Sequence, residues 1–321
     1  MTRVLLIGGG GLIAAALLTV WFLWWRPGPL DKDSYFVVEE GWTVAVVGDR
    51  LESVGLIRQN RRNFYRMARL LGSSDPVQAG EFEIPARASP ARILDILQHG
   101  QPIQRIVTVI PGMPSIIVGE RLAANPYLSG PSPPIAEGSV LPDSYGYQRE
   151  ETRAALVRRM QSAMTRTVDQ LWPRRDYACP IATKEEAVVL ASIVEKETAK
   201  PSERPIVAGV YCNRLRIGMK LDADPTFIYP ITKGKPLGRR PLKSEVHARN
   251  PYNTYVIAGL PPGPITNPGK AAIQAVLHPA KTKALYFVAD GTGGHVFAET
   301  LAEQNANVAK WYAIRRQRGE M

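Results

Sequence analysis

The feature that most constrains this chain is an uncharged apolar run of 22 residues from Val4 to Trp25. As a helix this run would be about 33 Å long, enough to cross a hydrocarbon core of about 30 Å. Three tryptophans, Trp21, Trp24 and Trp25, lie at its far end, and amphipathic rings favour the headgroup level of a bilayer. We therefore expect residues 1–3 to be a cytoplasmic N-terminus, residues 4–25 a transmembrane anchor and residues 26–34 a linker.

A buried core helix and a cleaved signal peptide are the alternatives to an anchor. A core helix of this length is unusual at the very end of a chain, and a signal peptide has a shorter apolar region followed by small residues. Here Arg26 and Pro27 follow the tryptophans instead. The positive charges that flank the run are close to balanced, so charge does not decide which side the rest of the chain occupies.

The net charge of +11 suits anionic surroundings such as lipid headgroups or a cell-wall polymer. Part of this charge is concentrated at helical spacing, on Arg58, Arg62, Arg66 and Arg69. A solvated helix face is the simpler interpretation of that row. Nucleic acid is not expected as a partner, because no zinc pattern or aromatic RNA-binding signature accompanies the charge.

The pattern after the linker predicts two domains and an α+β fold. Strands are expected over residues 35–41 and 79–85, and helices over residues 44–54, 60–71 and 89–99. A strand–helix–helix–strand unit of this size is typical of small glycan-binding domains, so we expect a LysM-like module over residues 35–105. Residues 106–321 are predicted to form a mixed α+β catalytic domain, with long helices over residues 151–172 and 184–198 and a short strand over residues 284–288.

The sequence predicts no metal and no cofactor. The four histidines show no metal-binding spacing, and zinc-protease, serine-hydrolase, P-loop and dinucleotide motifs are absent. Cys179 and Cys212 have no CxxC pattern and no histidine at metal spacing. A disulfide between them would be allowed outside the cytoplasm but cannot be inferred from two residues, so we expect two unpaired, partly buried thiols.

The segment from Ala182 to Glu203 carries the best candidate for catalysis. Thr183 and Glu186 form a capping box that starts a helix, and the apolar run after them predicts that this helix is buried. Glu197 shares a helical face with apolar residues three, four and seven positions before it, so burial should raise its pKa, as a general acid requires. Glu195 is less favoured by this periodicity, and both could instead be solvated glutamates of the last helical turn.

Three long segments resemble the endolytic murein transglycosylase family, the MltG or YceG-like proteins. They run from Leu190 to Tyr229, from Asn250 to Gly269 and from His278 to Asn305. The resemblance implies an anchored lyase that cleaves the MurNAc–GlcNAc bond within nascent peptidoglycan strands without water. One acid protonates the bridging oxygen and then accepts the proton of the muramic C6 hydroxyl, which leaves a 1,6-anhydro end. The family's catalytic glutamate matches Glu197.

The resemblance also implies a location and partners. The globular part is expected on the periplasmic side of the inner membrane, with glycan strands as substrate, membrane lipid around the anchor, and peptidoglycan synthases as possible partners. The cleavage is expected to limit strand length. The rival hypothesis is a non-catalytic, membrane-anchored glycan-binding protein that positions synthases. Residues expected to bind substrate are Glu195, Asn213, Asp224, Thr226, Tyr252, Asn253, Thr254, Tyr255 and His295; for most of them, shaping the loops is an equally good interpretation.

Overall fold

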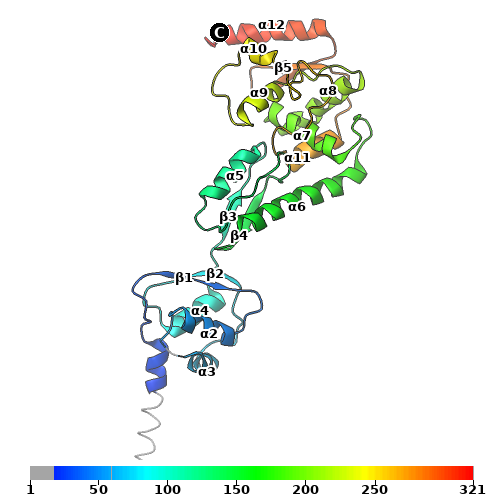
Figure 1. The fold of residues 1–321 in the computed structure, drawn as a ribbon. Coiled ribbons are helices and arrows are strands. Elements are labelled where there is room, and N and C mark those ends of the chain that lie inside the picture. The colour runs from blue at the N-terminus through cyan, green and yellow to red at the C-terminus, as the bar shows by residue number, and fades with distance from the viewer. Residues whose placement is uncertain (1–17, 59, 321) are drawn as a thin grey trace, which may run out of the picture. The chain divides into compact units, whose positions relative to one another are not determined.

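A computed structural model describes residues 18–58 and 60–320 and divides the chain into two compact units (Figure 1). The first unit contains the residues up to Arg105 together with Tyr147–Arg149, and the second contains Ile106–Gly146 and the residues from Glu150 onward. Each unit has its own hydrophobic core. The observed mixture of helices and small two-stranded sheets agrees with the predicted α+β class.

Most of the predicted transmembrane anchor, residues 4–17, lies outside the described residues. Residues 18–25 are helical, and Trp24 is buried against Phe64, with ring centroids 5.6 Å apart. Within the part of the chain that the structure describes, no helix is both long and apolar enough to cross a membrane.

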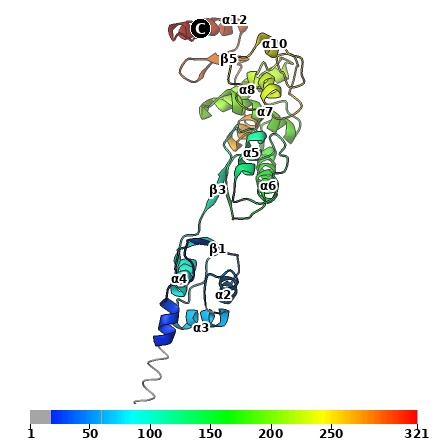
Figure 2. The same cartoon turned by 60° about the vertical axis from the view of Figure 1, so that its left-hand side comes forward.

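The first unit is a strand–helix–helix–strand–helix arrangement. Its elements are β1 (Ser34–Val38), α2 (Val44–Ser53), α3 (Arg61–Leu71), β2 (Gly80–Ile84) and α4 (Pro90–His99). The antiparallel strands pair Phe36 with Phe82, and α2, α3 and α4 lie on one side of them (Figure 2). The side chains of Thr43, Asn60 and Ser89 each accept a hydrogen bond from a free backbone amide in the first turn of one of the three helices. The predicted order of elements is confirmed, and the LysM likeness of the unit stays a prediction.

The second unit is built around three mutually packed helices, α7 (Lys184–Glu197), α8 (Arg204–Arg216) and α11 (Lys270–Leu277). Their fully buried apolar side chains form most of its core. The elements before this core are β3 (Arg105–Thr108), α5 (Ser115–Ala124), β4 (Ser144–Tyr147) and α6 (Arg153–Leu171), followed by a short 3-10 turn at Trp172–Arg174. A second 3-10 turn, Pro201–Glu203, lies between α7 and α8. Strands β3 and β4 pair with each other.

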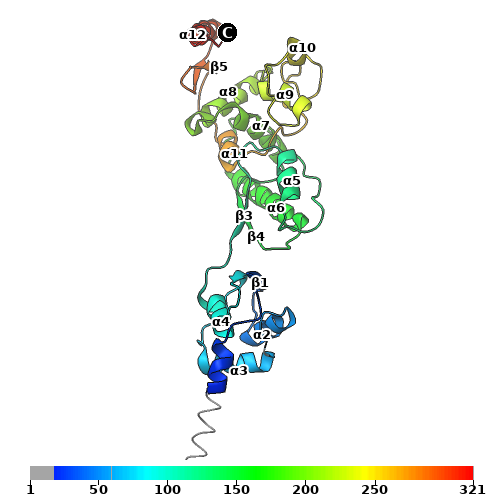
Figure 3. The same ribbon diagram turned by 90° about the vertical axis from the view of Figure 1, so that its left-hand side faces the viewer.

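The remaining elements of the second unit are α9 (Asp224–Thr232), α10 (Lys243–Val246), β5 (Tyr286–Ala289), β6 (His295–Ala298) and α12 (Leu301–Gln317). Strands β5 and β6 form an antiparallel hairpin. The three views place β5 and α12 at the end of this unit that is away from β3 and β4 (Figure 3). The helices predicted over residues 151–172 and 184–198 are confirmed within two residues, as α6 and α7.

The sequence-based prediction lacks several helices of this unit, α8 and α12 among them. Helix α8 is preceded by a turn signal, Pro201 and Ser202, and Pro205 stands in its first turn. Helix α12 also had a signal, because Thr300 and Glu303 form a capping box: the Thr300 hydroxyl accepts from the Glu303 amide at 3.2 Å and the Glu303 carboxylate accepts from the Thr300 amide at 3.1 Å.

The expectation of two unpaired thiols is wrong. Cys179 and Cys212 form a disulfide, with Cα atoms 4.8 Å apart. Cys212 lies on α8, and Cys179 lies in the loop between α6 and α7, 33 residues earlier. A separation of this size in the sequence gives no sign that two lone cysteines are neighbours, because their approach depends on how α8 packs.

Candidate active site

Helix α7 positions Glu197 as its last residue. The helix begins with the predicted capping box, in which the Thr183 hydroxyl accepts from the Glu186 amide at 3.1 Å. Leu190, Ile193 and Val194 are fully buried, so the packing of the helix fixes where its last turn points. The chain then becomes extended at Thr198, with φ −136° and ψ 132°.

The carboxyl group of Glu197 is the most perturbed acid of the second unit. Its Oε1 atom is buried and accepts no hydrogen bond from any described residue. This burial raises the pKa of Glu197 to about 7; a hydrogen bond from Tyr211 and the charge of Arg214 act in the opposite direction, and Asp224 adds to the increase. A carboxylic acid with this pKa is partly protonated at neutral pH, as general acid catalysis requires.

Tyr211, which donates to this carboxyl group, and Arg214, whose charge acts on it, lie one turn apart on α8. Burial raises the pKa of Tyr211 well above its ordinary value, so the phenol stays a neutral donor. The Arg214 guanidinium donates to the Leu285 carbonyl at 2.6 Å and to the Leu221 carbonyl at 2.9 Å, and its Nη1 lies 3.2 Å from Asp222 Oδ2. Arg214 therefore joins α8 to the loop before α9 and to the start of β5.

Glu197 opens into a cleft of about 430 Å³. Polar groups and aromatic rings from several parts of the unit line it: the end of α7, helix α8, the start of α9 with the loop before it, the loop that carries Tyr255, the β5–β6 hairpin and α12. The lining side chains that bear on the chemistry are Arg214, Asp222, Asp224, Tyr255, His295, Trp311, Tyr312 and Arg315. Aromatic rings beside charged and hydroxyl groups suit a sugar, which offers both apolar ring faces and hydroxyl groups.

Asp224, Tyr255 and His295 are the predicted substrate-binding residues that the structure brings into this cleft beside Glu197. The Tyr255 hydroxyl donates to Asp224 Oδ1 at 2.6 Å. His295 Nδ1 lies 2.7 Å from Glu203 Oε2. Asp224 is the first residue of α9, where a carboxylate is favoured by the helix dipole.

Glu195 has a structural role at a different place. Its Oε2 accepts from the Gly269 amide, which starts α11, at 2.9 Å, and its Oε1 accepts from Arg204 at 3.2 Å. The side chain is 4% exposed and is not part of the cleft lining. Both oxygens are thus engaged in holding α11 and α8 to the end of α7, whereas Glu197 keeps an oxygen without a partner.

Thr226 and Thr254 hold the loop around Tyr255 to α9. Their hydroxyl groups are 2.8 Å apart, and the Thr254 hydroxyl accepts from the Ala223 amide at 3.0 Å. Both residues are fully buried and lie outside the cleft lining. These hydrogen bonds hold together the two segments that carry Asp224 and Tyr255.

Asn213, Tyr252 and Asn253 also lie outside the cleft lining. The side-chain amide of Asn213 donates to the Ala284 carbonyl, in the segment before β5, at 3.0 Å. Asn253 is fully buried and donates to the Ala248 carbonyl at 2.9 Å. The Tyr252 ring packs against Tyr229, with centroids 5.0 Å apart. These side chains are occupied by contacts that shape the loops.

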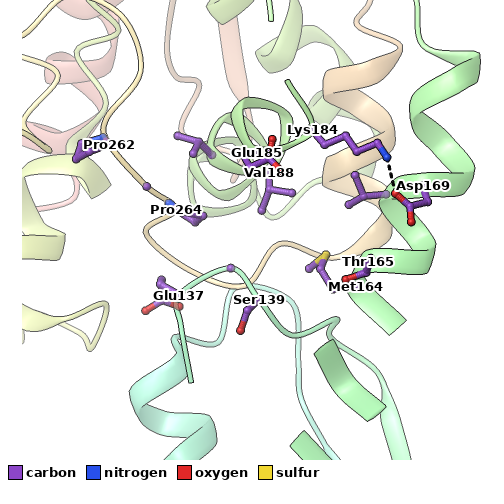
Figure 4. Close-up of a pocket in the computed structure, with 14 residues that line it drawn as sticks. Glu137, Ser139, Met164, Thr165, Asp169, Lys184, Glu185, Val188, Pro262 and Pro264 are labelled. Carbon is purple, nitrogen blue, oxygen red and sulfur yellow. Dashed lines mark hydrogen bonds and ion pairs between the residues drawn. The ribbon is translucent and has the colours of Figure 1, made fainter. Parts of the chain in front are cut away.

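A larger cavity of about 530 Å³ lies elsewhere in the second unit, between α6, the start of α7 and the loops around residues 138 and 263 (Figure 4). Lys184 and Asp169 form an ion pair at one side of it, with Nζ and Oδ1 2.6 Å apart. Burial raises the pKa of its Glu137 as well. Glu137, however, accepts from the Ser115 amide at 2.9 Å, so it lacks the free oxygen that makes Glu197 available for proton transfer.

Comparison with known proteins places the chain in a family. A family model described as the YceG-like family matches residues 36–310. The chain belongs to the YceG-like family. This confirms the resemblance seen in the sequence, and the match runs from within β1 to the middle of α12, so it includes most of both units.

Curated relatives of this YceG-like chain are named for an enzymatic activity. An "Endolytic murein transglycosylase" of Bacillus subtilis (strain 168) is 39% identical over 131 residues, which are 41% of this chain and 36% of that protein. A protein of the same name from Streptococcus pneumoniae (strain D39) is 30% identical over 239 residues, 72% of this chain and 40% of the relative. The matched region thus spans well under half the length of these relatives.

A solved structure supports the fold of the YceG-like chain. A crystal structure of a putative YceG-like protein from Listeria monocytogenes superposes with a TM-score of 0.53 at 22% identity, and the match covers 86% of this chain and 98% of that one. This likeness shows the fold and carries no argument about the reaction.

Tyr211, Arg214 and the cleft-facing residues of α12 were missed by the sequence-based reasoning. Arg214 had a recognisable signal, since it is a charged residue within the mostly apolar stretch from Ile206 to Leu215. A charged residue there must be either solvent-exposed or held by buried partners. The cleft-facing residues of α12 had no such signal, because their role depends on where the helix lies in the YceG-like fold.

Proposed function

We propose that this chain is a peptidoglycan lytic transglycosylase with Glu197 as its general acid. The observation that carries the proposal is the carboxyl oxygen of Glu197 that has no partner among the described residues, in a group whose pKa is raised to about 7 and which lines a 430 Å³ cleft. The curated relatives are named as endolytic murein transglycosylases, which supports the same activity.

The proposed reaction cleaves the MurNAc–GlcNAc bond within a glycan strand. Glu197 donates its proton to the bridging oxygen, the C6 hydroxyl of the muramic residue attacks C1, and a 1,6-anhydro end forms without water. Glu197 becomes a carboxylate by this transfer and is able to accept the proton that the C6 hydroxyl loses. Cleavage within nascent strands would limit their length.

The charges in the cleft favour this reaction over hydrolysis. A hydrolase needs a second carboxylate, as nucleophile or as base for water. Asp224 accepts a hydrogen bond from Tyr255 at 2.6 Å and Asp222 is 3.2 Å from the Arg214 guanidinium. Both carboxylates therefore have partners within the protein. An internal hydroxyl nucleophile removes the need for either of them to activate water.

The rival function is a protein that only binds glycan strands and positions synthases. A purely binding groove has no need for a buried acid with one oxygen that lacks a hydrogen-bond partner, because such an oxygen costs free energy. The state of Glu197 therefore favours an enzyme. Incubation with purified sacculi tests this directly: we expect soluble glycan fragments to appear, whereas binding of the protein without release of fragments would support the rival.

We propose that the second unit lies on the periplasmic side of the inner membrane. The Cys179–Cys212 disulfide supports this location, because disulfides persist outside the cytoplasm and are rare within it. In protein taken directly from cells under acid quenching, we expect alkylation of both cysteines only after reduction. A periplasm-dependent reporter fused after Met321 should be active as well. Free thiols together with a reporter that works only in the cytoplasm would contradict the proposal.

A further inference from the structure

Helix α3 of the first unit carries a row of arginines that have no acidic partner. Arg62, Arg66 and Arg69 are spaced by four and three residues, so they share one face of the helix. All three are exposed, and none of them forms an ion pair with a described residue. Arg58, which the spacing in the sequence assigned to the same face, lies before the helix begins at Arg61.

The acidic groups that flank this helix in the sequence are engaged elsewhere. No aspartate or glutamate occurs between Glu52 and Asp75. The Glu52 carboxylate accepts from the Arg61 amide at 2.8 Å, and Asp49 Oδ2 is 2.7 Å from the guanidinium of the same residue. Asp75 Oδ2 lies 2.9 Å from His99 Nε2. The positive charge of the arginine row is therefore not neutralised within the described part of the first unit.

Exposed apolar and aromatic side chains accompany the arginines on α3. Leu70, one turn after Arg66, is 76% exposed. Tyr65 is exposed as well, and the Arg69 guanidinium lies over its ring, 6.0 Å from the centroid. A basic helix face bordered by such side chains matches the surface of a bilayer, where cations meet the headgroups and apolar side chains enter the boundary with the acyl chains.

The helix of residues 18–25 lies beside α3. Its Trp24 is buried against Phe64 of α3, which fixes the two helices to each other. Trp21 and Trp25, on the same short helix, are exposed. In all three views this helix and α3 lie at one end of the unit, and strands β1 and β2 lie at the other. Because tryptophan rings favour the headgroup level of a bilayer, the exposed rings and the arginine row suit the same lipid surface.

We propose that the arginine face of α3, formed by Arg62, Arg66 and Arg69, binds the anionic headgroups of phospholipids and holds the first unit against a membrane surface. This interaction is separate from the proposed reaction, whose residues all lie in the second unit. Each basic side chain near an anionic bilayer strengthens binding by about fivefold, so the three arginines together contribute about 10²-fold. The exposed tryptophans favour a bilayer over a soluble anion, which offers no apolar boundary for them.

The test follows a fluorophore on Leu70→Cys in the full chain, mixed with vesicles that contain a nitroxide-headgroup lipid as quencher. Labelling without a reductant keeps the Cys179–Cys212 disulfide closed. Quenching should be stronger in vesicles of phosphatidylcholine mixed with phosphatidylglycerol than in phosphatidylcholine alone, because the mixed vesicles are anionic. Added salt should remove the difference, since it screens exposed charges.

A fluorophore on Glu83→Cys is the positional control. Glu83 is exposed on β2, and its neighbours Phe82 and Ile84 are buried, so its side chain points away from the three helices. Its quenching should not rise when phosphatidylglycerol is added. An equal rise at both probes would show adsorption without orientation and would overturn the inference.

Removal of the three charges should abolish the phosphatidylglycerol-dependent quenching of the Leu70→Cys probe. The variant combines Arg62→Gln, Arg66→Gln and Arg69→Gln. A control of equal charge change replaces three exposed basic residues of the second unit that lie outside the cleft lining, and it should keep the effect. It combines Arg158→Gln, Arg166→Gln and Lys310→Gln.

Three results would contradict a lipid-binding face on α3. One is equal quenching of the Leu70→Cys probe in neutral and anionic vesicles, and another is an equal loss of the effect in both triple variants. The third is an α3 variant that keeps its lipid-dependent quenching but binds less to purified sacculi, which would assign the face to glycan strands. If the α3 variant fails to fold, the comparison of the Leu70→Cys and Glu83→Cys probes in the two kinds of vesicle decides alone.

Discussion

Replacement of Glu197 by glutamine should lower the rate of glycan cleavage by about 10²–10⁴-fold, the usual cost of losing a general acid. Glutamine keeps the size of the side chain and removes the proton that the bridging oxygen would receive. Binding to sacculi, measured by cosedimentation, should stay close to the wild-type value, because the rest of the cleft is unchanged. Fragment release from purified sacculi measures the rate.

Glu185→Gln is the matched control for this experiment. Glu185 lies in the first turn of the same helix, is exposed and does not line the cleft, so its replacement should leave the rate unchanged.

The wild-type rate should fall as the pH rises through about 7, because the pKa of Glu197 is about 7 and the protonated form is the active one. A Glu197→Gln variant within tenfold of the wild-type rate would remove Glu197 from the mechanism.

Replacement of Arg214 by methionine should lower the free energy of unfolding by about 3 kcal/mol or more and abolish cleavage. Methionine fills much of the same volume but donates nothing, so the carbonyl groups of Lys220, Leu221 and Leu285 lose their donor. A buried acceptor left without its donor costs about 1–3 kcal/mol. Denaturant-induced unfolding, followed by circular dichroism, measures the change.

Arg158→Met is the control for the loss of an arginine as such. Arg158 is exposed on α6, and surface substitutions of this kind usually change the free energy of unfolding by less than about 0.5 kcal/mol. Equal effects of the two replacements would show that the carbonyl contacts of Arg214 contribute nothing specific. A stable but inactive Arg214→Met variant would instead assign its effect to the chemistry of the cleft.

Local signals in the sequence were sufficient for the helix that carries Glu197. The Thr183–Glu186 capping box sets its start, its apolar residues require burial, and the same periodicity places Glu197 beside apolar surface. All of these interactions lie within four to seven residues along one helix. For the same reason, the strands and helices of the first unit follow the predicted order.

Partners that are distant in the sequence could not be predicted in this way. Helical periodicity separates Glu195 from Glu197 only modestly, and the Gly269 amide that engages Glu195 in the structure lies 74 residues beyond it. Asn213 is engaged with carbonyl groups about 70 residues away. The Cys179–Cys212 disulfide and the pairing of Glu203 with His295 depend on tertiary packing in the same way. The sequence indicates which residues can do chemistry, and packing decides which of them remain free to do it.

The mass of the products tests the central claim most directly. Sacculi digested with the purified protein would be analysed by mass spectrometry and compared with a parallel hydrolytic digest. We expect each cut to leave a 1,6-anhydro end, lighter by one water, about 18 Da, than a hydrolytic end, since the C6 hydroxyl replaces water as the nucleophile. Reducing ends that retain this water would contradict the account, make the protein a hydrolase and turn attention to Asp224 as the second carboxylate.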